Sequence, residues 1–197
     1  SSNKVAVIYM VGSIGEGEGN DESIGSETAA KEIRKARLDT SIKAIVLRIN
    51  SPGGSSLASD VIWREVTLAR KAKPIVASMG DYAASGGYYI ACAADSIVAE
   101  PTTITGSIGV FGLMYNAQKL FNNKLGITFD TIKTSRMADL GSMTRPMRPD
   151  ERAMIEQEIE RIYQVFISHV AEGRRMKKSD VDSIGQGRVW SGTDALG

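Results

Sequence analysis

Ser85 lies in a glycine-rich segment between two apolar segments, and this placement suits a nucleophile. A strand expected at 74–79 leads into the segment Asp81–Tyr89, and a small-residue helix expected at 88–94 leads out of it. A hydroxyl at such a junction lies close to helix N–H groups that have no partner within the helix. These groups could stabilise the oxyanion that forms when the hydroxyl attacks a carbonyl carbon. The alternative is an ordinary N-cap serine, which needs no catalytic role.

A second glycine motif, Arg48–Ser55, follows an apolar strand pattern and precedes a helical pattern over Ser56–Lys71. The paired glycines Gly53 and Gly54 allow positive φ and a close approach of the backbone to a ligand. Loops that follow neighbouring strands of a parallel sheet meet at one crevice. This loop could therefore supply N–H donors to the carbonyl that Ser85 attacks, or it could be only a tight connection.

Composition argues against several classes of function. The chain has 197 residues with 24 basic and 23 acidic side chains, so its bulk charge gives no reason to expect a nucleic acid partner. The single cysteine, Cys92, excludes an internal disulfide and lies in an alanine-rich helix pattern, which predicts an inert core thiol. One histidine excludes a multi-histidine metal site. Neither glycine motif matches a phosphate-binding or dinucleotide-binding fingerprint, so we expect no metal and no cofactor.

Alternating strand and helix patterns predict an α/β domain with a largely parallel sheet. The expected strands are 5–11, 44–49, 74–79, 96–100 and 128–133, and the expected helices are 26–38, 56–71, 88–94, 116–125 and 149–176. Residues 12–25 are expected to form a mobile loop without a packing pattern, and residues 101–112 and 134–148 are expected to be irregular.

A serine nucleophile needs a base, and the only histidine is the first candidate. His169 lies inside the longest expected helix among apolar neighbours. No Gly-x-Ser-x-Gly elbow surrounds Ser85, because Ala83 and Gly87 occupy the outer positions. We therefore expect a structural histidine rather than a member of a catalytic triad.

A neutral lysine is the remaining choice of base. Lys133 has the best position, at the end of an expected strand beside an irregular segment, although an exposed strand-end lysine is the simpler interpretation. The helix-surface pattern of Lys31, Lys71, Lys73 and Lys119 makes them poor candidates.

Three motifs in order along the chain, Asn50–Gly54, Asp81–Tyr89 and Thr105–Val110, resemble those of the signal peptide peptidases of serine peptidase family S49. The resemblance covers essentially the whole chain, through Gly187–Gly192. It implies one peptidase domain over residues 1–197 with the crotonase/Clp-protease fold, an α/β architecture of repeated ββα units, here with a long C-terminal helix.

The family uses a Ser–Lys dyad without histidine. The resemblance makes Ser85 the nucleophile, and it makes Gly86, together with Gly53 or Gly54, the backbone donors to the oxyanion. It also implies that Ser107 helps to orient the lysine ammonium group.

One departure from the family pattern concerns the base. The segment Lys133–Asp139 is similar to the one that carries the catalytic lysine in short family members, but the catalytic position is Ala138. Long members contain two tandem copies, with the lysine in the first and the serine in the second. We expect this chain to be such a second copy, with its lysine in a missing N-terminal domain. An engineered Lys→Ala change in a short member is the alternative.

The resemblance also implies substrates and partners. Cleaved signal peptides and other short hydrophobic peptides would bind in an extended form, with Met79, Gly80 and Met114 lining a specificity pocket, although methionines fit core packing equally well. It implies a homo-oligomer that includes the N-terminal domain. It further implies attachment to a bacterial cell membrane through segments outside this chain, with the catalytic domain outside the cytoplasm.

Two rival functions stay open besides a Ser–His hydrolase, in which His169 would be the base and which unchanged activity of His169→Ala would exclude. An acyl-CoA enzyme of the crotonase kind would share the fold and the oxyanion hole, although no catalytic glutamate pair is evident near Gly53. A non-catalytic domain that only binds peptides or assembles the oligomer is the other.

Overall fold

The computed structural model describes residues 3–196. The chain divides into a larger unit, Ser1–Gly109 with Tyr163–Gly197, and a smaller unit, Val110–Ile162. We describe each unit by itself. The assignment of residues 1–197 to one peptidase domain stays a prediction.

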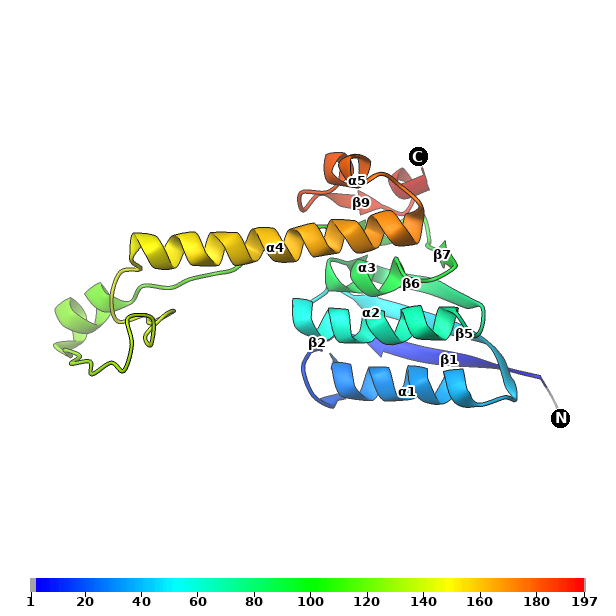
Figure 1. The fold of residues 1–197 in the computed structure, drawn as a ribbon, viewed down its shortest axis with the longest axis horizontal. Helices are drawn as coiled ribbons and strands as arrows, with labels where there is room; N and C mark the ends of the chain where they lie inside the picture. Colours follow the sequence, from blue (N-terminus) through cyan, green and yellow to red (C-terminus); the bar gives the residue numbers. More distant parts are fainter. Residues whose placement is uncertain (1–2, 197) are drawn as a thin grey trace. The chain divides into compact units, whose positions relative to one another are not determined.

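The larger unit is built on a six-stranded sheet (Figure 1). Its path is β1-β5-β6-β8-β9, and β7 pairs separately with β6. The strands are β1 (Lys4–Val11), β5 (Ile42–Ser51), β6 (Ile75–Ala84), β7 (Ser96–Val98), β8 (Ile104–Gly106) and β9 (Val189–Ser191). All pairings are parallel except that of β8 with β9. This arrangement confirms the predicted α/β class with a largely parallel sheet.

Three helices follow strands in the order that the sequence predicted. They are α1 (Ser26–Leu38), α2 (Ser56–Arg70) and α3 (Gly86–Ala91), and α1 packs on α2 and α2 on α3. Alternate residues of β5, namely Ile45, Leu47 and Ile49, are fully buried in the core that these helices share with the sheet. Burial of one face of the strand therefore fixes its register, because a slip of one residue would turn these side chains away from the core.

Helix α4 (Pro149–Arg174) matches the longest predicted helix and contributes to both units. In the larger unit, its residues Phe166, Ile167 and Val170 are buried in a second apolar cluster with Tyr89 and Val181. Val181 lies on the short helix α5 (Lys178–Ile184), which the sequence reading did not predict. Strand β9 and the short helix η2 (Asp194–Leu196) were also missed.

The expectation of an unpacked loop over residues 12–25 was wrong. This segment forms a small three-stranded sheet of β2 (Ser13–Gly15), β3 (Gly19–Asn20) and β4 (Ser23–Gly25), in the order β2-β4-β3. Ile14 and Ile24 are buried. Strands of two or three residues are too short to show a periodic pattern, so only their contacts reveal them.

Three other expectations need correction. The expected loop 101–112 contains β8, which pairs with both β6 and β9. The expected strand 128–133 does not form, and its residues are exposed without a partner strand in the described part of the chain. A π-helical turn, η1 (Leu120–Leu125), stands where a longer helix was expected. For both errors that concern strands, the presence or absence of a partner strand, rather than local strand propensity, decided the outcome.

Candidate active site

Ser85 occupies the junction between β6 and α3. Its φ of 52° and ψ of −119° lie outside the regions that residues with a Cβ prefer, which costs about 1–3 kcal/mol. Its N–H donates to Gly106 O at 3.0 Å. Its side chain makes no capping hydrogen bond to α3, so the ordinary N-cap interpretation does not account for this hydroxyl. A strained, half-buried serine with an uncommitted hydroxyl is the arrangement that a nucleophile requires.

The glycine loop (residues 51–55) packs directly against Ser85. Gly53 has a φ of 103°, and a Cβ at this position would lie 2.7 Å from Ser85 Cβ and 2.7 Å from Gly86 N. A Cβ on Gly87 would lie 2.8 Å from Ser51 O. The structure therefore brings together the two glycine motifs that the sequence singled out, and their contact leaves no room for larger residues.

The N–H groups of the three candidate glycines differ in their partners. Gly53 N–H donates to Ser51 Oγ at 3.1 Å. Within residues 3–196, neither Gly54 N–H nor Gly86 N–H has a hydrogen-bond acceptor. Gly54 and Gly86 are thus the two whose N–H groups are available to a ligand.

Ser107 lies beside Ser85 because of strand pairing. In the parallel ladder of β6 with β8, the final pair joins Ala84 and Gly106, and each serine is the next residue. Ser107 also has a positive φ, 48°, and its N–H donates to Arg188 O at 2.7 Å. Sequence motifs predicted both serines, but only the pairing of β6 with β8 makes them neighbours.

The expected specificity-pocket residues have different surroundings. Met79 is buried in the core, and Thr105 Oγ1 donates to its sulfur at 3.5 Å. Gly80 is also buried, and its carbonyl accepts from Thr103 Oγ1 at 2.8 Å. Met114 belongs to the smaller unit, where it is exposed. Core packing accounts for Met79 within this chain, and a role of these three residues in substrate binding stays a prediction.

His169 is part of a network that joins three helices of the larger unit. Its ring stacks on Trp63 with centroids 3.5 Å apart, and its Nε2 lies 3.2 Å from Asp60 Oδ1. Tyr89 Oη donates to the same carboxylate oxygen at 2.7 Å. These contacts match the structural role expected for this histidine.

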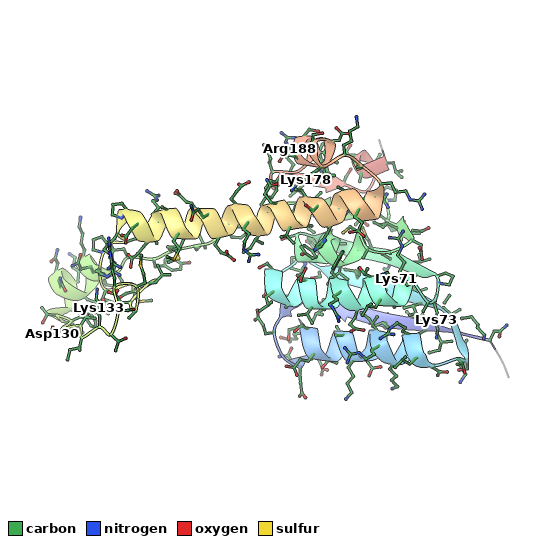
Figure 2. All side chains as sticks on the ribbon, viewed as in Figure 1. Lys71, Lys73, Asp130, Lys133, Lys178 and Arg188 are labelled. Atoms are coloured by element: carbon green, nitrogen blue, oxygen red, sulfur yellow. The ribbon has the colours of Figure 1, made fainter. Side chains whose placement is uncertain are left out.

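Lys133, the lysine whose sequence position best suited a base, forms an ion pair with Asp139. Lys133 is labelled in Figure 2. In the smaller unit, its Nζ lies 2.6 Å from Asp139 Oδ2, and Arg145 Nε contacts the same oxygen at 2.6 Å. A hydrogen bond from Arg145, and a weaker effect of the hydrogen bond from Lys133, hold the pKa of the Asp139 carboxyl well below its usual range. Ala138 is exposed beside this cluster. The segment therefore presents an ion-paired ammonium group and a methyl group rather than a free amine.

The Cys92 thiol is unreactive, and the side chains that could bind a metal ion are dispersed over the described residues. Burial raises the pKa of the Cys92 thiol to about 12, which keeps it protonated. No group of three or more His, Cys, Asp or Glu side chains suited to a metal ion occurs among the described residues. Over that same part of the chain, none of the helices has the length and apolar character needed to cross a bilayer.

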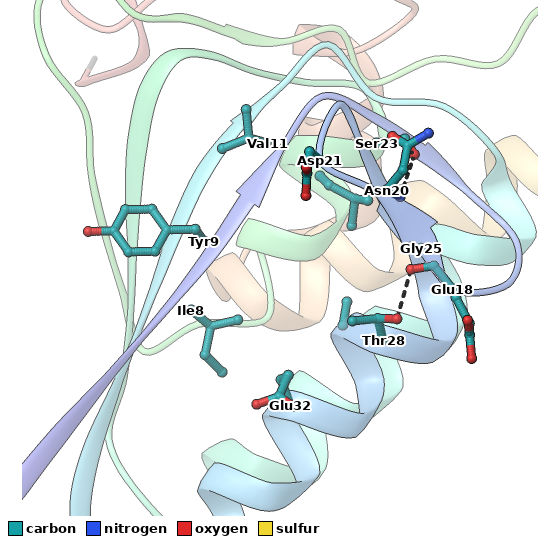
Figure 3. A pocket seen from close by; sticks show the side chains of 12 residues that line it. Ile8, Tyr9, Val11, Glu18, Asn20, Asp21, Ser23, Gly25, Thr28 and Glu32 are labelled. Carbon is teal, nitrogen blue, oxygen red and sulfur yellow. Dashed lines mark hydrogen bonds between the residues drawn. The ribbon is translucent and has the colours of Figure 1, made fainter.

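A pocket of about 440 Å³ that the sequence did not suggest lies between β1, the small sheet and α1 (Figure 3). Its floor includes Ile8 and Ile24, and its rim carries Glu18, Asp21 and Glu32. Ser85 does not line this pocket, so the candidate active site is a separate surface feature.

Two family models match this chain and agree with its fold. The family model described as Peptidase family S49 matches residues 67–197, and the one described as Clp protease matches residues 16–103. The second match and the parallel sheet confirm the Clp/crotonase-like fold.

Three relatives illustrate the similarity. Protease 4 of Salmonella typhi is 47% identical over 97% of this chain and 31% of its own length. Serine protease SPPA, chloroplastic, of Arabidopsis thaliana is 42% identical over 98% of this chain and 29% of its own length. Putative signal peptide peptidase SppA of Enterococcus faecium is 32% identical over 100% of this chain and 58% of its own length. This chain thus spans less than a third of the first two relatives. On the extent of the family match, the chain belongs to peptidase family S49.

Proposed function

We propose that this chain carries the nucleophile of a serine peptidase, Ser85, and that the general-base lysine comes from another part of a longer polypeptide. The observation that carries the proposal is the contact of the glycine loop with Ser85. Among the described residues, the N–H groups of Gly54 and Gly86 have no acceptor, and the Ser85 hydroxyl makes no hydrogen bond. Membership of a peptidase family supports the same chemistry.

The reaction would proceed through an acyl-enzyme. The lysine removes the proton of Ser85 Oγ as this oxygen attacks the peptide carbonyl, and the carbonyl oxygen becomes an oxyanion. The C–N bond then breaks, and the lysine returns the proton to the leaving amine. Water, deprotonated by the same lysine, hydrolyses the ester and restores the serine hydroxyl. An oxyanion donor in such a site contributes about 3–4 kcal/mol to transition-state stabilisation.

We assign the oxyanion donors to Gly54 and Gly86 rather than Gly53. The Gly53 N–H already donates to Ser51 Oγ, and redirecting it would leave that buried hydroxyl without this contact. Ser107 follows the last residue of β8, as Ser85 follows the last residue of β6, and it would accept a hydrogen bond from the lysine ammonium and orient it.

The origin of the base is the second part of the proposal. Ala138 cannot accept a proton, and Lys133 is paired with Asp139. We infer that the chain corresponds to the second copy of a tandem protein and receives its lysine from the first. The substrates would be cleaved signal peptides and other short hydrophobic peptides, a class suggested by the name of the Enterococcus faecium relative. The complete protein would be a membrane-associated homo-oligomer with its peptidase portion outside the cytoplasm.

The test compares this chain alone with the complete polypeptide. The chain alone should not hydrolyse a fluorogenic hydrophobic peptide, whereas the complete polypeptide should hydrolyse it and lose activity with Ser85→Ala. Ser96→Ala, a change at an exposed serine of β7, is the matched control and should retain activity. Ser85-dependent hydrolysis by the chain alone would contradict a missing base and direct attention to Lys133.

The second candidate function is a non-catalytic role in peptide binding or assembly. Ala138 favours it, because alanine stands where the family resemblance places the catalytic lysine. That role would leave the complete polypeptide equally active with and without Ser85→Ala. A short family member with an altered lysine would instead gain Ser85-dependent activity in the chain alone on Ala138→Lys.

A further inference from the structure

The strand β2 and the residue that follows it contact the glycine loop. We propose that Ile14 and Glu16 are positioning residues that hold the glycine loop where Gly54 N–H can meet the oxyanion. This inference rests on the proposed function. It assigns a role in the site to a segment that the sequence predicted to be a mobile loop.

Ile14 contacts both glycines that are proposed as oxyanion donors. Its N–H donates to Gly53 O at 2.9 Å, and its carbonyl accepts from Ser55 N at 2.9 Å. These two bonds bracket Gly54 in a parallel bridge, which turns the Gly54 N–H away from Ile14. On the other motif, Ile14 Cδ1 lies 3.1 Å from the position of a Cβ on Gly86.

The close approach of β2 explains why position 54 requires glycine. A Cβ on Gly54 would lie 2.1 Å from Ile14 O, a distance that backbone atoms cannot accommodate. Because Ile14 itself is buried, its backbone forms a fixed support for the loop.

Glu16 supports the end of the glycine loop that leads into α2. Ser55 Oγ donates a short hydrogen bond to Glu16 Oε1 and accepts one from Ala58 N at 3.3 Å, so Ser55 caps α2 while tied to β2. The bond from Ser55 lowers the pKa of Glu16, which favours the ionised form. A carboxylate near the first turn of a helix is also stabilised by the unpaired N–H groups there. Glu16 therefore ties the far end of the glycine loop to β2.

Ser59 links Ser55 to Gly86, the residue that follows Ser85. Ser59 Oγ donates to Ser55 O at 2.8 Å and lies 2.5 Å from the position of a Cβ on Gly86. Ser55 is thus held by β2 on one side, and through Ser59 it contacts the residue that follows Ser85. Displacement of Ser55 would move both oxyanion donors relative to the nucleophile.

The first experiment measures loop order in this chain alone and requires no activity. Amide hydrogen exchange of Ile14 and Ser55 should accelerate about tenfold in Glu16→Ala, because loss of a hydrogen bond to a charged group favours local opening. Exchange in β5 should not change. Glu18→Ala is the matched control: Glu18 lies in the same acidic segment, and its carboxylate has no partner within residues 3–196.

The second experiment measures catalysis in the complete polypeptide. Glu16→Ala should lower kcat about tenfold with little change in KM, because a displaced donor weakens transition-state binding more than substrate binding. Glu16→Gln keeps an acceptor for Ser55 and should recover most of the rate. Glu18→Ala should match the parent enzyme.

The outcomes separate this inference from the proposed function. Unchanged exchange, or faster exchange with unchanged kcat, would overturn the positioning role even if Ser85→Ala abolishes activity. A fully active Ser85→Ala enzyme would refute the proposed function itself. A fall in kcat that accompanies a general loss of thermal stability, with no rescue by Glu16→Gln, would show a merely structural role.

Discussion

At the scale of single residues, the candidate site contains two of the four residues with a Cβ that have positive φ within residues 3–196. Ser85, Ser107 and Gly53 all have positive φ, and the first two carry a Cβ that makes this conformation costly. Strain of this kind persists only where surrounding contacts over-determine it. Here those contacts are the glycine loop, the β6–β8 ladder and the start of α3.

Gly53→Ala tests whether these contacts are as tight as the geometry indicates. The new Cβ would meet Gly86 N and Ser85 Cβ at 2.7 Å and would occupy a positive φ. We expect a loss of about 1–3 kcal/mol in the free energy of unfolding, measured by urea denaturation, together with loss of peptidase activity in the complete polypeptide. Gly15→Ala is the control, since nothing lies within 4 Å of its Cβ position. Equal stability of the two variants would contradict the close contact.

At the scale of secondary-structure elements, polar networks complement the apolar core. In the larger unit, Asp60, Tyr89 and His169 join α2, α3 and α4 by hydrogen bonds. Tyr89 N–H also donates to Ser85 O at 2.9 Å, so this network supports the helix that begins at the nucleophile. In the smaller unit the organising contacts are ionic, and Glu151, the second residue after Pro149 in α4, is almost fully buried among arginines.

The first turn of α4 should therefore be sensitive to acid. Hydrogen bonds from Arg145 hold the pKa of Glu151 at about 2, below its ordinary value of 4.5. A depressed carboxyl pKa stabilises the folded form above the ordinary value, and this contribution is lost as the pH falls from 4.5 towards 2. The protection factors of amides 150–156, which correct the measured exchange rates for the intrinsic pH dependence of exchange, should fall over this range in the parent chain.

Glu151→Gln should remove that acid dependence, because an amide does not titrate. Glu156→Gln, at an exposed partner of Arg152 on the same helix, should leave the dependence intact. An acid transition that survives in Glu151→Gln would assign it to another group, with Asp139 as the nearest alternative.

At the scale of the whole molecule, the smaller unit lacks an apolar core. None of the apolar side chains of residues 110–162, all of which the structure describes, is buried. Those exposed by two thirds or more are Phe111 (85%), Leu113 (69%), Tyr115 (69%) and Ile132 (99%). Exposed apolar side chains at this density are typical of surfaces that another protein covers.

We therefore expect the chain to self-associate, in agreement with the proposed homo-oligomer. Sedimentation velocity should show an average mass that rises with concentration. The double change Phe111→Ser with Ile132→Ser should shift the chain towards the monomer. Leu196→Ser, which removes an equally exposed leucine from the larger unit, is the control and should have little effect. A parent chain that stays monomeric at all concentrations would refute this expectation.

Local patterns of apolar residues in the sequence predicted much of the fold. The helices α1, α2 and α4 and the strands β1, β5 and β6 were predicted from apolar periodicity, because each buries one regular face in a core. The strand β8 and the small sheet were missed, because strands of two or three residues are too short to show a periodic pattern. The predicted strand at 128–133 failed for a different reason: strand-forming residues without a partner strand stay irregular.

What the sequence by itself determined was the chemistry that is available: a serine and two glycine motifs after strands, the absence of a usable histidine, and alanine at position 138. Residue type and chain order decide these features. Only the tertiary structure decided which groups meet. It committed the Gly53 N–H to Ser51 and left that of Gly54 free, set Ser107 beside Ser85 through the β6–β8 ladder, and brought Ile14 and Glu16 against the glycine loop. Apart from the local bond of Gly53 to Ser51, these contacts join residues about 20 to 40 positions apart, and such long-range pairing leaves no local pattern in the sequence.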